Sequence, residues 1–288
     1  MSAISRIANL VPDVLLPALI LITTLSYFYS QPWVQQWWMN FSQHKSHYVI
    51  FATALPLTIV TYWIHVGAMA VIDLWQRPKY LWRRKIQPGK IPDKNLYLKV
   101  LGNVLVNQLI VAPLFGTSLF AISEWFGWTY SYTKNLPGTL ELLGQLSVFL
   151  VIEELGFYYG HRWLHSTALY KPIHKKHHEL TAPIGIAAIY CHPIEHILSN
   201  LLPLLLGPLV MRSHILLLWT WVVLGQANAI NSHCGFVLPL MPSPLAHDYH
   251  HATFNSNFGV LGVLDRWHRT QGNFEEWARN WEKKIKGE

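Results

Sequence analysis

Histidines gather in three short motifs in the second half of the chain. HRWLH, HKKHH and HDYHH contain, in order, His161 and His165, then His174, His177 and His178, then His247, His250 and His251. On a helix, residues three or four positions apart share one face, so each motif should direct its imidazoles into one small volume. If the three helices converge, eight nitrogens meet there, and His233 of the NSHCG segment would make nine.

So many imidazoles exceed what one metal ion binds. A zinc ion takes four protein ligands in a structural site and three in a catalytic site, so this set predicts two metal ions. Imidazole suits iron, copper, nickel and zinc, and the motifs contain no thiolates of the kind that hold iron–sulfur clusters. A single HxxHH motif is also typical of a solvated helix face. Its repetition with identical spacing, next to an HxxxH motif, favours a metal centre.

Metal-bound imidazoles are oriented by hydrogen bonds to a second group, for which a carboxylate is well suited. The acidic residues near the motifs are the candidates: Glu153, Glu154, Glu179, Glu195, Asp248 and Asp265. His192 of CHPIEH is a further candidate for a ligand or supporting ring, although Pro193 disfavours a helical conformation there. His196 is another. The remaining histidines are expected at membrane interfaces, in packed positions or at the surface: His44, His47, His65, His214 and His268.

The composition indicates what kind of element must position these residues. Hydrophobic residues make up 51% of the 288-residue chain and charged residues only 13%, against about 25% charged in soluble domains. The chain is therefore expected to be a membrane protein. Two cysteines are too few for a disulfide scaffold. Nucleic-acid binding is not expected, because no basic stripe interleaved with aromatic residues is present.

Four apolar segments have the length that crosses a hydrocarbon core of about 30 Å. They are residues 11–30, 48–74, 100–126 and 139–160. Residues 197–227 are also apolar, but Pro203, Pro208 and Arg212 interrupt them, which favours a helical hairpin that dips into the bilayer. The predicted fold is an all-α integral membrane bundle of about four transmembrane helices plus this hairpin. Residues 1–138 form its transmembrane region, 139–272 the histidine-rich domain and 273–288 a charged tail, all in one structural unit.

The distribution of basic residues predicts the orientation of the chain in the membrane. Residues 77–99 contain eight Lys and Arg and one acidic residue, Asp93, so the positive-inside rule places this loop in the cytosol. Counting spans from it puts both termini and the histidine motifs on the cytosolic side as well. The chain ends in KKIKGE, with Lys284 and Lys286 five and three places from the end. This pattern resembles the KxKxx retrieval signal and predicts the endoplasmic-reticulum membrane.

The order and surroundings of the motifs resemble the fatty acid hydroxylase / sterol desaturase superfamily over residues 145–270. The segments that carry the resemblance are EELGFYYGHRWLH, YKPIHKKHHELTAPIG, YCHPIEH, INSHCG and HDYHHATFNSNFGVLGVLDR. HxxHHExxAPxG followed by YxHPxE is similar to the C4-methylsterol oxidase branch. This chain departs from that branch where it has AAIYCHPIEH and LDRWHRT, and these departures leave the substrate open.

The resemblance implies two non-haem irons that use O2 to hydroxylate a C–H bond of a sterol, with C4-methyl oxidation favoured, or of a related lipid. Fatty acid or sphingoid-base hydroxylation, lipid desaturation and aldehyde-forming wax chemistry remain alternatives. So do two non-oxygenase roles, a haem-carrying electron-transfer protein and a non-catalytic regulator of lipid synthesis. The lipid would reach the site from the bilayer along aromatic residues beside the motifs: Tyr158, Tyr159, Trp163 and Tyr190.

The electrons must come from another protein. The chain has no GxGxxG-type dinucleotide fingerprint, and the resemblance implies a supply from NAD(P)H through a cytochrome b5-type carrier and its reductase. An acidic haem protein could dock on the basic loop 77–99, although this loop could equally serve topology alone.

Overall fold

Helices account for the regular structure of this protein. The structure, a computed structural model, describes residues 11–133, 135–239 and 241–286. Four helical stretches among them are long and apolar enough to cross a membrane: His47–Trp75, Lys94–Trp125, Pro193–Val210 and Ile215–His233. At about 1.5 Å per residue, even 18 residues extend to nearly the thickness of a hydrocarbon core. The chain is thus a multi-pass membrane protein by the composition of its helices.

Shorter elements build these stretches and complete the bundle. The first stretch contains α4 (His47–Ala52) and α5 (Ala54–Trp75), and the second contains α7 (Lys94–Val106), the π-helical turn η1 (Asn107–Val111) and α8 (Ala112–Trp125). The third contains α10 (Pro193–Glu195), the π-helical turn η4 (His196–Leu201) and α11 (Leu202–Val210), and α12 (Ile215–His233) is the fourth. The others are α2 (Val11–Ser30), α3 (Pro32–Ser42), α6 (Lys79–Trp82), α9 (Thr139–Leu164), η2 (His174–Glu179), η3 (Gly185–Ile189), α13 (Leu245–Thr253), α14 (Val263–His268) and α15 (Phe274–Lys286).

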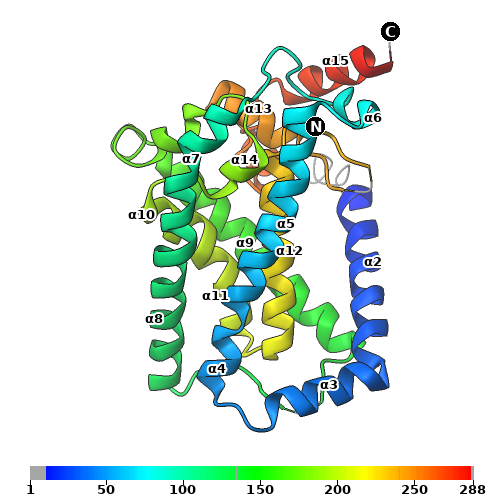
Figure 1. Cartoon of the computed structure of the whole chain (residues 1–288), viewed down its shortest axis with the longest axis vertical. Coiled ribbons are helices and arrows are strands. Elements are labelled where there is room, and N and C mark those ends of the chain that lie inside the picture. Colours follow the sequence, from blue (N-terminus) through cyan, green and yellow to red (C-terminus); the bar gives the residue numbers. More distant parts are fainter. Residues whose placement is uncertain (1–10, 134, 240, 287–288) are drawn as a thin grey trace.

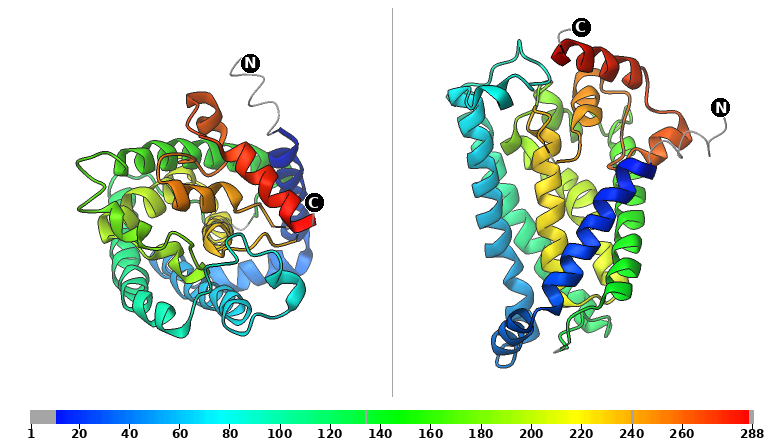
Figure 2. Two further views of the ribbon diagram at one scale, coloured as in Figure 1. Left: turned by 90° about the horizontal axis from the view of Figure 1, so that it is seen from above. Right: turned by 90° about the vertical axis from the view of Figure 1, so that its right-hand side faces the viewer.

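The two ends of the bundle differ in content (Figure 1). One end carries α6, α13, α14 and α15, whereas α3 and α4 lie at the other. Figure 2 shows the same division from the side, with α15 lying across the end of the long helices. The basic loop and the histidine motifs therefore share one end of the molecule, as the charge pattern predicts. Residues 1–10, 287 and 288, which include the last two positions of the KxKxx pattern, lie outside the described residues.

The predicted hairpin reaches farther than a dip into the bilayer. Its arms are the third and fourth apolar stretches, and its tip pairs with the loop that follows α8. Ser131 donates from its backbone N–H to Ser213 O at 3.0 Å, and Ile215 donates to Ser131 O at 2.9 Å. Because that loop lies at the end remote from the histidines, the hairpin extends through the full depth of the bundle. The hairpin that was expected to dip into the bilayer thus has two arms that are each long enough to cross it.

Close packing of α11 on α9 holds this hairpin in place. A Cβ on Gly207 would lie 2.9 Å from Phe149 Cα, so only glycine allows the two backbones to approach this closely. The predicted span 139–160 lies within α9, which packs in the bundle but carries Glu141, Glu153 and Glu154. It is not among the four most apolar stretches of the described chain.

A buried ion pair ties the basic loop to the histidine end. Lys85 Nζ lies 3.3 Å from Asp73 Oδ1, with both side chains almost fully buried. Tyr97 donates to the other oxygen of Asp73 at 2.7 Å. The backbone of the same loop pairs with the segment that follows His233, since Ile86 N–H donates to Gly235 O at 2.9 Å. Lys85 is therefore a buried residue of the basic loop and not part of its charged surface.

Candidate metal centre

Nine histidines meet at this end of the bundle in two adjoining clusters. His161, His165, His174, His178 and His250 form the first, called here the five-histidine cluster. His177, His233, His247 and His251 form the second, called here the four-histidine cluster. Within each cluster the candidate ligand nitrogens all lie within 4.8 Å of one another. The clusters touch, since the rings of His178 and His251 are 4.8 Å apart at their centroids. All the histidines of the three motifs, together with His233, are therefore brought together.

Each HxxHH motif is divided between the two clusters. His174 and His178 enter the five-histidine cluster, whereas His177 between them enters the other. The second motif does the reverse, since His247 and His251 enter the four-histidine cluster and His250 crosses over. HKKHH and HDYHH therefore do not each fill one site, as was predicted, whereas His161 and His165 of HRWLH both enter the five-histidine cluster. In addition, the HKKHH motif folds as the 3₁₀ helix η2, not as an α-helix.

Backbone carbonyls orient most of the rings. His161, His177, His233, His250 and His251 each place Nδ1 at 2.7 to 3.1 Å from a carbonyl oxygen. The acceptors are, in the same order, the carbonyls of Phe258, Tyr190, Ala229, Ser256 and Leu180. Because a carbonyl can only accept, these rings carry their proton on Nδ1. Their Nε2 lone pairs are then free to bind a metal.

Only one predicted carboxylate touches a ring. Glu195 Oε1 accepts from His174 Nδ1 at 2.8 Å. Glu154 instead accepts from three backbone N–H groups of the loop before α14, those of Val260, Leu261 and Leu264. Glu179 pairs with Lys99 and Tyr190, and Asp248 accepts from Gln87 at 2.8 Å. Glu154, Glu179 and Asp248 thus bond to other donors and contact no imidazole directly, and an indirect orienting role for them stays a prediction.

Asp265 supports a histidine ring indirectly, through the backbone. It accepts from the backbone N–H groups of Phe258 and Gly259 at 2.9 and 2.7 Å. The carbonyl of Phe258 is the acceptor for His161, so Asp265 fixes the segment that holds this ring. Sequence reasoning missed Gln87, which donates to both Thr181 O and Asp248 and thereby ties the segment that follows η2 to α13. Its place within a run of lysines and arginines hides it from a search for charged or ligating residues.

The nitrogens are arranged as metal ligands would be. In the five-histidine cluster, Nε2 of His174 lies 2.8 Å from that of His165 and 2.9 Å from that of His178. In the other cluster, Nε2 of His247 lies 2.9 Å from that of His233. Ligand atoms at right angles around a metal with bonds of about 2.1 Å lie about 3 Å apart. Lone pairs that converge at this separation repel one another unless a cation lies between them, so the residues fit two metal ions.

Burial keeps these rings neutral. It lowers the pKa of His174 to about 3, and burial together with the neighbouring His174 ring lowers the pKa of His165 to about 3. Burial also holds the pKa values of His250 and His251 well below the usual range. A neutral imidazole is the form that binds metal, so the site needs no deprotonation at neutral pH.

The other histidines lie outside the two clusters. His192 accepts from Ile194 N–H through its ring and caps α10, so its predicted role as a ligand is not supported. His196 is buried and bonded to Asn200. His214 caps α12 at the remote end of the bundle and is buried there, not exposed at an interface.

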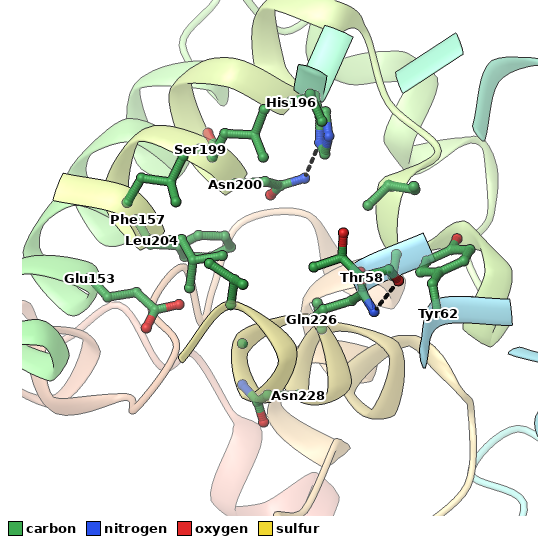
Figure 3. Close-up of a pocket in the computed structure, with 18 of the residues that line it drawn as sticks. Thr58, Tyr62, Glu153, Phe157, His196, Ser199, Asn200, Leu204, Gln226 and Asn228 are labelled. Atoms are coloured by element: carbon green, nitrogen blue, oxygen red, sulfur yellow. Dashed lines mark hydrogen bonds between the residues drawn. The ribbon is translucent and has the colours of Figure 1, made fainter. Parts of the chain in front are cut away.

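A cavity of about 380 Å³ opens onto both clusters. It touches His161 of the first cluster and His177, His233 and His247 of the second, and it extends to Tyr48 on α4 near the remote end. Figure 3 shows part of its lining, with Phe157 and Leu204 as apolar wall and His196, Asn200 and Gln226 as polar groups. Its volume falls within the range typical of small-molecule sites.

The four aromatic residues predicted to line the lipid path do not line this cavity. Tyr158 is buried with its hydroxyl 3.1 Å from Thr270 Oγ1, and Tyr159 bonds His268. Trp163 is 60% exposed, and Tyr190 donates to Glu179. The cavity lies between the long helices, where small and apolar residues leave space.

A helical membrane bundle with two all-imidazole clusters at the end of an apolar cavity defines the class of membrane di-metal proteins. The chain belongs to the fatty acid hydroxylase family, whose family model, described as "Fatty acid hydroxylase", matches residues 146–270. It is 40% identical over 252 residues to fatty acid hydroxylase domain-containing protein 2 of Homo sapiens, covering 87% of this chain and 74% of that protein.

Two other relatives extend the comparison. Fatty acid hydroxylase ahd1 of Mycosarcoma maydis is 35% identical over 265 residues, which cover 88% of this chain and 67% of that protein. Methylsterol monooxygenase 1 of Gallus gallus is 30% identical over 221 residues, which cover 74% of this chain and 73% of that protein. No solved structure matches this chain.

The contrast between the two glutamates predicts a measurable difference. Glu195→Gln should lower the affinity for metal by about 10- to 100-fold, because the amide holds the His174 ring less firmly than the carboxylate does. Glu179→Gln is the matched control, since Glu179 is half exposed and touches no imidazole. Metal titration of both purified variants checks this expectation. Equal affinities for the two variants would contradict the role given to Glu195.

Proposed function

We propose that this chain is a membrane-bound non-haem di-iron oxygenase that hydroxylates a C–H bond of a neutral lipid. The observation that carries this proposal is the cavity, which begins among the membrane-spanning helices and ends on rings of both histidine clusters. A lipid that fills it would have one end at the metal centre and the rest within the depth of the bundle. The family membership supports the same chemistry.

The residues of this chain would divide the work. The nine histidines of the two clusters would hold the irons, and the carbonyls and Glu195 would keep the rings in position. When bound, the two irons supply the oxidation by O2 that converts a C–H bond to an alcohol. The apolar wall, with Phe157 and Leu204, would exclude water and fix which carbon of the lipid faces the histidines.

Within this chemistry we favour the C4-methyl group of a sterol as the target. The HxxHHExxAPxG and YxHPxE segments and the identity to methylsterol monooxygenase 1 support this choice. Hydroxylation of a fatty acid or sphingoid base is the second candidate, supported by the higher identity to two proteins named for fatty acid hydroxylation. Desaturation and a non-catalytic role in lipid synthesis are further alternatives that the same assay addresses.

The proposal includes an external electron supply and a location. Electrons would come from NAD(P)H through a cytochrome b5-type carrier and its reductase. Seven of the eight basic residues in the loop 77–99 remain exposed at the histidine end. Lys99 pairs with Glu179, and the other six are available to an acidic carrier: Arg77, Lys79, Arg83, Arg84, Lys90 and Lys94. The endoplasmic-reticulum membrane, with the histidine end and both termini in the cytosol, is the proposed setting.

Labelled oxygen tests the function directly. The full chain is purified, loaded with ferrous iron, placed in lipid nanodiscs and supplied with NADH, the carrier and its reductase under ¹⁸O₂. We expect about two irons per chain and one ¹⁸O atom on the C4-methyl carbon of a 4-methylsterol. Labelling of an acyl chain instead would favour the second candidate. Absence of any labelled lipid from iron-loaded protein would contradict the oxygenase, as would a haem spectrum.

A further inference from the structure

Two neighbouring tyrosines connect the five-histidine cluster with the surface of the protein. The ring of Phe258 contacts three rings of that cluster at centroid distances of 5.1 to 5.9 Å, those of His161, His165 and His250. Tyr158 lies 6.3 Å from Phe258, edge to face, and Tyr159 packs in the same manner on Tyr158 at 5.1 Å. Tyr158 is buried, whereas Tyr159 is 48% exposed. Contacting rings therefore lead from the histidines to the surface.

The hydroxyl of Tyr158 has a defined proton acceptor. Thr270 Oγ1 donates to Asp265 Oδ1 at 2.6 Å, and this bond uses the only hydroxyl proton of the threonine. The Tyr158 hydroxyl, which lies 3.1 Å from Thr270 Oγ1, must therefore be the donor between these two groups. A proton can thus move from Tyr158 to Thr270 while the Thr270 proton moves to the Asp265 carboxylate.

Tyr159 has a base of its own at the surface. Its hydroxyl lies 2.9 Å from Nε2 of His268, and the His268 ring also stacks on Tyr158 with 5.3 Å between the centroids. The imidazole is exposed, so it can accept the phenol proton and release it to water. Both tyrosines therefore have a hydrogen-bonded base within reach, one in the interior and one at the surface.

Tyr170 contacts the same cluster but is not built in this way. Its ring lies 5.7 to 6.1 Å from the rings of three ligand candidates, those of His165, His174 and His178. Among the described residues its hydroxyl has no hydrogen-bond partner. A phenol that gives up an electron must also give up its proton, so a tyrosine without a bonded base is the harder one to oxidise. Contact with the histidines alone thus does not produce the arrangement seen at Tyr158.

The chemistry proposed for the metal centre creates a need for such a route. When O2 is reduced there and no C–H bond of a lipid is within reach, a strong one-electron oxidant is left beside nine imidazoles. Histidine rings can themselves be oxidised, and each ring lost in this way weakens the site. A tyrosine whose proton has a ready acceptor is easier to oxidise than an imidazole, so it can protect the ligands.

We infer that Tyr158 and Tyr159 form a redox relay that carries an unused oxidising equivalent from the histidine clusters to the surface. The inference rests on the proposed function for its oxidant, which derives from O2. Its reductant is a water-soluble thiol that meets the exposed ring of Tyr159. The two tyrosines thereby gain a protective role that is separate from the binding of metal or lipid.

The electrons and protons of the relay balance. Tyr158 gives one electron past Phe258 to the metal held by the five-histidine cluster, and its proton enters the route through Thr270. The neutral Tyr158 radical then takes one electron from Tyr159 and regains its proton by the same route, while the Tyr159 proton passes to His268 and on to water. The thiol finally gives one electron and one proton to Tyr159 and becomes a thiyl radical, two of which combine to a disulfide.

Electron paramagnetic resonance tests the relay by a signal other than product formation. The iron-loaded full chain is placed in nanodiscs of saturated phosphatidylcholine without sterol, reduced, exposed to O2 and frozen. We expect a tyrosyl radical in the wild-type protein, identified by the narrowing of its spectrum when ring-deuterated tyrosine is incorporated. Tyr158→Phe should lose this signal. Tyr170→Phe is the matched control and should keep it, because Tyr170 touches the same cluster but lacks the proton route.

Two further variants separate a relay from a structural role. Thr270→Val keeps the Tyr158 ring but removes its proton acceptor, so it should also lose the signal while it binds as much iron as the wild type. In Tyr159→Phe the radical should remain on Tyr158 and no longer be quenched by reduced glutathione, which quenches it in the wild type. Peptide mass spectrometry should find more oxidised histidine in Tyr158→Phe than in Tyr170→Phe after repeated exposure to O2.

The outcomes distinguish this inference from the proposed function. A full radical signal in iron-loaded Tyr158→Phe or Thr270→Val, or its loss in Tyr170→Phe alone, would overturn the relay. Labelled lipid product from a wild-type protein that forms no tyrosyl radical would overturn the relay and leave the oxygenase intact. A radical on Tyr158 without any labelled lipid would support the relay and reject the lipid oxygenase.

Discussion

Replacing His177 with alanine is expected to lower the bound iron from about two per chain to below one and to abolish turnover. His177 is the histidine of its motif that crosses into the four-histidine cluster, so its loss leaves three rings for that metal. Even changes to groups that only support a ligand reduce metal affinity or activity by about 10- to 100-fold, and removing the ligand itself should exceed this. Metal analysis together with the labelled-oxygen assay measures both effects.

His192→Ala provides the control for this substitution. His192 also lies in the histidine-rich region, but it caps α10 and belongs to neither cluster. The variant should keep its iron and its turnover. Both variants should be recovered from the membrane in amounts similar to wild-type protein, because the apolar helices are unchanged. An iron-loaded and active His177→Ala protein would refute the assignment of His177 as a ligand.

Lys85→Met should destabilise the protein by about 3 to 5 kcal/mol, because it leaves Asp73 charged and buried without its partner. We expect this to appear as a Tm lower by on the order of 10 °C, measured by heating the purified protein and following its size-exclusion profile. Iron content should also fall. The backbone on either side of Lys85 pairs with residues 235–237, directly after His233, so loosening the loop releases one wall of the four-histidine cluster.

A double variant separates the buried charge from the lost packing. Asp73→Asn combined with Lys85→Met removes both charges and keeps an acceptor for Tyr97, so it should regain much of the lost stability. Lys90→Met, an exposed position in the same loop, should change the Tm little. If Lys85→Met matched Lys90→Met in stability, or if the double variant were no better than the single one, the ion pair would not have the structural role given to it.

The helical bundle could be predicted because apolar length is a direct consequence of the bilayer. Residues 48–74 and 100–126 correspond closely to His47–Trp75 and Lys94–Trp125. The depth of the hairpin could not be predicted, since Pro203, Pro208 and Arg212 are as compatible with a shallow turn as with two crossing arms. Their effect depends on partners, namely the pairing of Ser213 with Ser131 and the fit of Gly207 against Phe149.

The identity of the clustered histidines was predictable, but their partition was not. Spacing shows that His174, His177 and His178 lie close together, yet the position of a second site relative to the motif decides which ring enters which cluster. The carbonyl groups that accept from the histidine rings could not be predicted either, because every residue type has a backbone carbonyl. Lys85 is a third case, since nothing in a run of basic residues distinguishes the one lysine that is buried.

Each HxxHH motif contributes one histidine to the cluster that holds the other two histidines of the opposite motif, and this arrangement affects how the metal centre assembles. His177 and His250 each belong by chain position to one motif and by location to the opposite cluster. Filling either site therefore orders η2 and α13 together and lowers the entropic cost of organising the other site. Such linkage is a coupling free energy between the two binding events, and it is reciprocal. The metal centre should consequently load in a cooperative manner, with half-filled protein rare at equilibrium.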